Sequence, residues 1–126
     1  MNADLLQGFY LRNLLVEPLT GKVTGPSGGG HLGPRAAEVL VQLASAPGDL
    51  VTRETLLNEV WGEGQGSNEL LSRAIGEIRH ALDDYPDDPV FIQTLPRRGY
   101  RLIVTPESVG ESTSSIVLGV SDGARA

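Results

Sequence analysis

The stretch SNELLSRAIGEIRHAL, residues 67–82, decides the fold of this chain. At 100° per residue, its apolar side chains gather on one side and its small and polar side chains on the other. Ser67 suits the N-cap position, and Glu69 places negative charge in the first turn, where the helix dipole favours it. The pattern predicts an amphipathic helix whose buried residues are Leu70, Ala74, Ile75, Ile78, Ala81 and Leu82.

The opposite side of this helix carries the side chains that a partner would meet. We expect Ser72, Arg73, Gly76 and His80 there, with Arg79 at its edge. Amphipathic helices are common at protein surfaces, so this face alone does not indicate a function. The segments on either side of the helix make the indication more specific.

Two further helices are predicted before residue 67. Pro34 suits a first helical turn, and the apolar residues that follow recur at helical spacing until Pro47 and Gly48 end the helix. Thr52 then caps a shorter helix that ends at about Trp61, and a glycine-rich loop follows it. The predicted buried residues are Ala36, Val39, Leu40, Leu43 and Ala44 in the first helix, and Leu56, Leu57, Val60 and Trp61 in the second.

A hairpin is predicted after the long helix. Residues 83–89 form an acidic loop, DDYPDDP, whose two prolines disfavour a helix. The segments FIQTL (91–95) and YRLIV (100–104) are typical strands and flank a tip made by residues 96–99, PRRG. Gly99 supplies the positive φ that such a tip often needs.

The N-terminal third predicts a small sheet. Residues 8–32 contain short apolar runs separated by turn signals, which indicate two or three antiparallel strands and leave a fourth open near His31 and Leu32. The glycine run at 25–30 lacks the spacing of a phosphate-binding loop, so we interpret it as a hairpin connection. The fold class is therefore α+β, with one domain over residues 1–105 and a linker or disordered tail over residues 106–126.

Composition restricts the compartment and the partners. The chain has no cysteine, no signal-like N-terminus and no apolar run of membrane-spanning length, so we expect a cytoplasmic domain. The net charge of −6 argues against strong non-specific binding to nucleic acid. Nine of the ten basic residues are arginine, which suits bidentate contacts to phosphate and guanine, and five of them lie between residues 73 and 101.

Catalysis finds no support in the sequence. An enzyme needs a nucleophile with a base, a metal cluster or a carboxylate pair. His31 and His80 have no metal-ligand spacing with acids, and residues 83–88 lack the pattern of a calcium loop. We expect no enzyme activity, no metal and no cofactor, and we interpret Asp83, Asp84, Asp87 and Asp88 as a solvated acidic loop.

Over residues 8–104 the chain resembles the OmpR-type winged helix-turn-helix family of bacterial transcription regulators. The matching segments are PGDLVTRE (47–54) with LL (56–57) and VW (60–61), and SRAI (72–75) with IR (78–79) and ALDD (81–84). The segment IQTLPRRGYRL (92–102) is the most specific, and with its position near the N-terminus it most resembles the CadC and ToxR branch.

This resemblance implies a sequence-specific DNA-binding domain: an N-terminal antiparallel sheet, three helices and a C-terminal wing. Residues 67–82 would enter the major groove and residues 96–99 the adjacent minor groove. Each candidate also has an interpretation without a function, because an exposed arginine can simply be solvated or can form an ion pair with an acidic residue one turn away on the same helix. We interpret Trp61 and Tyr100 as packing residues. The candidate DNA-binding residues are Asn68, Ser72, Arg73, Arg79, His80, Arg97, Arg98 and Arg101.

The implied partner is double-stranded DNA, bound by two copies on tandem half-sites, with RNA polymerase left open as a second partner. In this branch the parent protein carries a membrane segment, so we expect a fragment of a regulator anchored in the inner membrane. The alternative is a winged helix used for protein contact or dimerisation without direct DNA binding, which the net charge favours.

Overall fold

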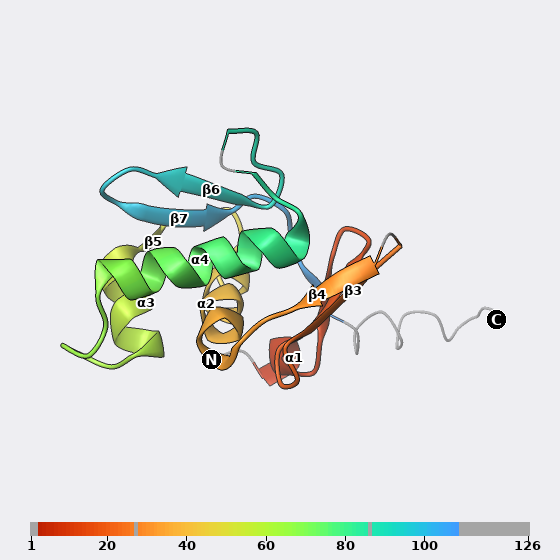
Figure 1. Cartoon of the computed structure of the whole chain (residues 1–126), viewed down its shortest axis with the longest axis horizontal. Helices are drawn as coiled ribbons and strands as arrows, with labels where there is room; N and C mark the ends of the chain where they lie inside the picture. The colour runs from red at the N-terminus through yellow and green to blue at the C-terminus, as the bar shows by residue number, and fades with distance from the viewer. Residues whose placement is uncertain (1–2, 27, 86, 109–126) are drawn as a thin grey trace.

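The computed structural model describes residues 3–26, 28–85 and 87–108 of the 126-residue chain. Three helices form the centre, namely α2 (Pro34–Ala44), α3 (Arg53–Val60) and α4 (Asn68–Leu82). A short helix α1 (Ala3–Leu6), which the sequence did not predict, precedes the first strand. One antiparallel sheet lies beside the end of α4 and a second lies along its length (Figure 1). The expected α+β winged-helix architecture is confirmed.

The N-terminal sheet has five strands in the order β4-β3-β2-β1-β8. They are β1 (Phe9–Leu11), β2 (Leu14–Glu17), β3 (Lys22–Gly25), β4 (Gly28–His31) and β8 (Glu107–Ser108). The fourth strand, which the sequence indicated only as a possibility, is therefore present. It includes glycines that the sequence pattern assigned to a hairpin connection. A Cβ at Gly29 would overlap the carbonyl oxygen of Val23, and one at Gly30 would lie 3.0 Å from Ala81 Cα. Glycine lets β4 pack closely between β3 and α4.

Strand β8 moves the expected domain boundary. Glu107 pairs with Tyr10 and Ser108 pairs with Phe9, so the fold extends past residue 105 into the predicted tail. Two residues with little strand propensity form this strand because the exposed edge of β1 supplies the pairing. The rest of that tail, residues 109–126, lies outside the described residues.

The three helices begin where the sequence indicates. Pro34 opens α2, and the side chain of Thr52 accepts a hydrogen bond from the Thr55 amide at 3.1 Å at the start of α3. Ser67 Oγ accepts from the Leu70 amide at 3.2 Å at the start of α4. The predicted caps are confirmed.

The predicted buried face of α4 was wrong at its first position. Leu70 is 36% exposed, whereas Leu71 is 1% exposed and belongs to the core. Leu71, Ile75 and Arg79 lie at successive turns on one buried side of α4, and Arg79 donates to Ile92 of the wing sheet. The prediction with Arg79 at the edge of the polar side turns the apolar face away from Leu71.

The second sheet is the wing, with strand order β5-β7-β6. Strands β6 (Ile92–Leu95) and β7 (Gly99–Leu102) form the predicted hairpin, and β5 (Val51–Thr52), which was not predicted, pairs with β7. At the tip Arg97 takes the left-handed conformation with φ 66°. Glycine is also required at position 99 for a steric reason, because a Cβ there would overlap the carbonyl oxygen of Val51.

The core lies between the two sheets and the three helices. Its largest fully buried side chains come from both sheets and from all three central helices, which ties both sheets to one centre. They are Phe9, Leu11, Leu32, Leu40, Leu43, Leu56, Leu71, Ile78, Ile92, Leu102, Val16 and Val39. Tyr100 is also buried, as predicted, and Trp61 packs partly buried against the core.

Candidate nucleic-acid interface

Two polar contacts fix the orientation of α4 about its axis. The Glu77 carboxylate accepts a hydrogen bond from the Gly33 amide at the start of α2, and the Arg79 guanidinium reaches the wing. At 100° per residue, the arc between these contacts on the solvent side carries Ser72, Arg73 and His80. This arc is exposed along its whole length, so the fold presents it to a partner.

Small residues in the middle of this arc leave the backbone of α4 close to the protein surface. Ser72 is exposed, and a Cβ built on Gly76 would meet nothing within 4 Å. Asn68, the first residue of α4, is also exposed. The structure therefore places two of the predicted residues, Asn68 and Ser72, on a surface that another molecule can approach closely.

Arg73 is an exposed guanidinium on the same arc. Its Nη2 lies 4.0 Å from Glu69 Oε2 in the preceding turn, and both side chains are largely exposed. An exposed pair at this spacing stabilises a helix by only about 0.3–0.5 kcal/mol. The Arg73 side chain can therefore exchange Glu69 for a phosphate or a base edge at small cost.

His80 lies at the far end of the arc. It is exposed and lines a hollow of about 400 Å³ together with Pro26 and Gly28 of the N-terminal sheet. The structure thus places His80 beside the β3–β4 turn.

The structure corrects the predicted position of Arg79. The sequence placed it at the solvent edge of α4, but it is 7% exposed, and its guanidinium donates to Ile92 O at 3.1 Å and to Thr94 Oγ1 at 2.6 Å. Its Nη1 also lies 3.6 Å from Asp84 Oδ2. Because these partners occupy the guanidinium inside the protein, Arg79 does not belong among the DNA-contacting residues.

Asp84 corrects the expectation of a fully solvated acidic loop. It is 4% exposed, and its carboxylate accepts hydrogen bonds from the amides of Val90, Phe91 and Ile92 at 2.7, 3.2 and 3.0 Å. These donors offset the hydration that the carboxylate loses on burial. Asp83, Asp87 and Asp88 are exposed, as predicted.

Asp83 also affects its neighbour Tyr85. The phenol of Tyr85 donates to Asp83 Oδ1 at 2.8 Å. This hydrogen bond, together with the carboxylate charge, raises the pKa of Tyr85 above its ordinary value. The contact joins two exposed residues of the loop that leaves α4.

The wing tip presents Arg97 and Arg98, both exposed as predicted. Its backbone is fixed at two places, since the Arg98 amide donates to Leu95 O at 2.9 Å and the Arg53 amide donates to Arg98 O at 3.1 Å. The Arg53 guanidinium also donates to Arg97 O at 3.4 Å. The tip is therefore attached to the start of α3 while its two side chains remain free to reach outward.

Arg53 is a candidate that the sequence analysis missed. A hollow of about 400 Å³ beside the start of α3 is lined by Arg53, Arg97 and Arg98, and also by Glu54 and Thr52. The signal was partly visible, because a capped helix start is a common phosphate site. The pairing of β5 with β7, which brings Arg53 to the wing tip, had no signal in the sequence.

Arg101 is half-buried in β7, and it alternates with the buried residues Tyr100 and Leu102. It pairs across the ladder with Gln93 of β6. Its Nε is buried and has no hydrogen-bond partner among the described residues. Arg101 is thus less available to a partner than the tip arginines.

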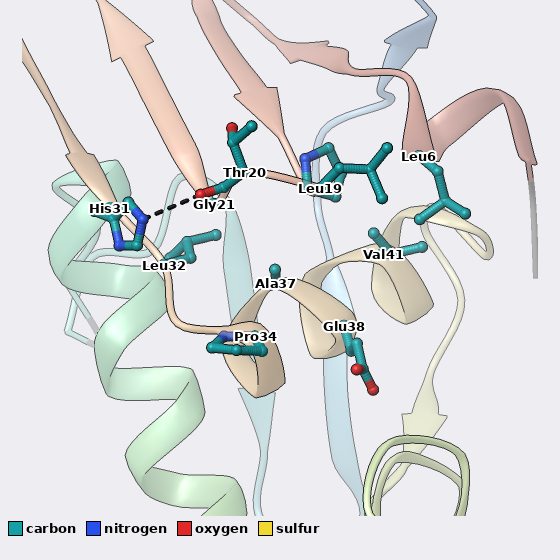
Figure 2. Close-up of a pocket in the computed structure, with 11 residues that line it drawn as sticks. Leu6, Leu19, Thr20, Gly21, His31, Leu32, Pro34, Ala37, Glu38 and Val41 are labelled. Carbon is teal, nitrogen blue, oxygen red and sulfur yellow. Dashed lines mark hydrogen bonds between the residues drawn. The ribbon is translucent and has the colours of Figure 1, made fainter.

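A separate pocket of about 430 Å³ lies between α1, the β2–β3 turn and α2, with Leu6, Leu19, Leu32 and Val41 around it (Figure 2). His31 Nε2 lies 3.1 Å from Thr20 O at its rim. The lining is mostly apolar and contains no arginine or lysine. This pocket therefore differs in chemistry from the hollow beside the wing.

Within the described ranges, no group of three histidines, cysteines or acids is placed to hold a metal ion. Among the same residues, no helix is long and apolar enough to cross a membrane.

The short N-terminal sheet, the three helices and the arginine-tipped hairpin define a winged helix-turn-helix domain of the OmpR type. Residues 28–102 match the family model described as "Transcriptional regulatory protein, C terminal". The chain belongs to this family of transcription regulator domains.

Two curated relatives support this membership. The chain is 34% identical over 91 residues to the transcriptional activator CadC of Escherichia coli, a match that covers 71% of this chain and 18% of CadC. It is 37% identical over 87 residues to the cholera toxin homolog transcriptional activator of Vibrio parahaemolyticus, covering 67% and 30%. The matches span less than a third of either relative.

Solved structures agree on the fold. The DNA-binding domain of E. coli CadC superposes with a TM-score of 0.69 at 30% identity, covering 80% of this chain and 95% of that domain. The Klebsiella pneumoniae RstA DNA-binding domain, solved with the RstA box, gives a TM-score of 0.65 at 23% identity, covering 77% and 97%. The second likeness concerns the fold alone.

Proposed function

We propose that this domain binds a specific sequence of double-stranded DNA, with α4 in the major groove and the wing tip in the adjacent minor groove. The observation that carries the proposal is the uncovered arc of α4 with Asn68, Ser72 and Arg73, combined with a wing that projects Arg97 and Arg98. The hairpin tip and the start of α4 lie toward the same end of the molecule (Figure 1). The similar domain of E. coli CadC, at 30% identity, is a DNA-binding domain.

On α4 the side chains divide by their chemistry. Arg73 donates to guanine O6 and N7 or to a phosphate, and Asn68 and Ser72 donate to or accept from base edges and phosphates. Gly76 keeps the helix close to the groove floor. His80, at the far end of the arc, is placed for a backbone contact beyond the recognition positions.

On the wing, the narrow minor groove attracts Arg97 and Arg98 through its negative potential. The Arg53 guanidinium, at the start of α3, supplies a phosphate contact beside them. Arg101, on the wing strand β7, is proposed to contact a phosphate.

The net charge of −6 is compatible with this assignment. Three exposed acids, Asp83, Asp87 and Asp88, lie in the loop after the C-terminal end of α4, whereas Arg53, Arg97 and Arg98 border a single hollow. The acidic residues reduce non-specific attraction to DNA, so affinity depends more on the matched operator.

One such module buries a modest area on DNA, so two copies on tandem half-sites would supply useful affinity. Contact with RNA polymerase is a further part of the proposal and has no assigned surface. Because a bacterial chromosome lies in the cytoplasm, the proposed activity belongs in that compartment, including for a regulator whose other parts are anchored in a membrane.

The alternative function is protein contact without DNA. The apolar pocket beside Leu19, which is 76% exposed, favours this reading because it offers a partner an uncovered hydrophobic surface. Salt separates the two functions, since phosphate contacts weaken steeply with salt and an apolar interface does not.

The experiment is selection of bound duplexes from a random pool, performed with the full chain at two salt concentrations. We expect one enriched motif whose affinity falls as salt rises. The double substitution of Arg97 and Arg98 by alanine should enrich the same motif more weakly, whereas Arg12→Ala, at an exposed arginine in the β1–β2 turn, should enrich it as the wild-type chain does. Failure of the wild-type chain to enrich any motif at either salt concentration would contradict DNA binding.

A further inference from the structure

Strand β6 has a free edge in the wing sheet, because the strand order is β5-β7-β6. In an antiparallel ladder, alternate residues direct both backbone groups to the same neighbour. Phe91 and Leu95 face β7, since their carbonyl oxygens accept from Ile103 at 2.8 Å and from Arg98 at 2.9 Å. Ile92, one residue after Phe91, therefore directs its amide and its carbonyl toward the free edge.

Arg79 and Asp84 cover this edge. Asp84 Oδ2 accepts from the Ile92 amide at 3.0 Å, and Arg79 Nη1 donates to the Ile92 carbonyl at 3.1 Å. The two charged groups lie 3.6 Å apart and are both buried. Together they supply one donor and one acceptor to Ile92, as a residue of a neighbouring strand would.

Further contacts extend this junction. Arg79 Nη2 donates to Thr94 Oγ1 at 2.6 Å, and Asp84 Oδ1 accepts from the amides of Val90 and Phe91. The Asp84 amide donates to Arg79 O at 2.8 Å, so both charged residues belong to the end of α4. We name the set Arg79, Asp84, Ile92 and Thr94 the α4–β6 clasp.

We propose that the α4–β6 clasp sets the position of the wing relative to α4, so that the two elements reach adjacent grooves together. This inference rests on the proposed DNA-binding function. Arg79 and Asp84 are positioning residues that touch no DNA. The planar fork of Arg79 reaches Ile92 O and Thr94 Oγ1 from two nitrogens, which the single ammonium of lysine cannot reproduce.

The geometry of the clasp can be measured without DNA. The chain has no cysteine, so spin labels at Glu69→Cys on α4 and Arg98→Cys on the wing tip report one distance by electron paramagnetic resonance. We expect a narrow distance distribution that becomes roughly twice as broad, or shifts, in Arg79→Lys and Thr94→Val. The matched controls are Arg35→Lys, in an ion pair within α2, and Thr24→Val, exposed on β3.

Circular dichroism identifies which of these variants are folded. If Arg79→Lys does not fold, the milder Thr94→Val, which removes one hydrogen bond, decides the question. An unchanged distance distribution in every folded clasp variant would overturn the inference.

A second readout tests the consequence for binding. On a duplex selected by the wild-type chain, Thr94→Val should weaken binding roughly fivefold, as expected for one lost hydrogen bond. The loss should vanish when Arg97 and Arg98 are already alanine, because there is then no wing contact to misplace. Equal losses in both backgrounds would indicate a general effect on the fold and would overturn the positioning role. If the wild-type chain binds no duplex, the proposed function fails, and the distance measurement still decides whether the clasp positions the wing.

Discussion

The backbone amide of Arg53 donates a hydrogen bond to the carbonyl oxygen of Arg98 at 3.1 Å, which joins the first residue of α3 to the tip of the wing. These residues are far apart in the sequence, and the pairing of β5 with β7 brings them together. As a result, the start of α3 and three arginine side chains border one hollow. This arrangement suits a DNA phosphate beside the minor groove.

Arg53→Ala should weaken binding to all duplexes by a similar factor, because a phosphate contact carries no sequence information. The slope of log affinity against log salt concentration should become shallower by about one, as expected for the loss of one phosphate contact. Fluorescence anisotropy over a salt series measures both quantities. A change in the preferred motif would instead indicate that Arg53 reads a base.

Arg73→Ala should cost about 1–3 kcal/mol of binding free energy and relax the preference at one base pair if the guanidinium reads guanine. The loss of its exposed pair with Glu69 should hardly change stability. Competition binding against single-base variants of the selected duplex measures the relaxed position. Glu69→Ala is the matched control, because it removes the pair and leaves the guanidinium.

Replacing both Arg97 and Arg98 with alanine should weaken binding to most duplexes together and leave the major-groove preference in place. Both side chains are exposed, so the melting temperature should stay close to that of the wild-type chain. Gel-shift titration and thermal unfolding measure the two effects. Wild-type affinity in this variant would contradict a role for the wing.

Two glycines should respond to alanine in opposite ways. Gly76 is exposed within α4 with open space around it, so Gly76→Ala should raise the free energy of unfolding by about 0.5–1 kcal/mol. Gly99→Ala should lower it, because the new Cβ would overlap the backbone of Val51. Urea unfolding of both variants measures the difference, and a destabilised Gly76→Ala would show that its surroundings are more crowded than described.

Local chemistry allowed much of the fold to be predicted. Ser67 and Thr52 cap their helices through contacts three residues away, and the hairpin around residues 96–99 is marked by its own turn residues. Such signals need no knowledge of the tertiary structure.

The errors arise where a distant partner decides the outcome. Arg79 looks like a surface residue until Asp84 and the free edge of β6 are placed beside it. Similarly, Gly29 is a strand residue because β4 pairs with β3, at a distance where a Cβ would overlap the carbonyl oxygen of Val23. Among the candidate site residues, Arg73, Arg97 and Arg98 are exposed as the local sequence pattern predicts, whereas the place of Arg53 beside the wing depends on the β5–β7 pairing.

The most direct test of the central claim is a nitrogen–proton NMR titration of the labelled chain with its selected duplex. We predict that the largest amide shift changes fall on the solvent side of α4 from Asn68 to His80, at residues 96–99 and at the start of α3. Changes confined to the apolar pocket around Leu19, or no changes at saturating duplex, would contradict the account.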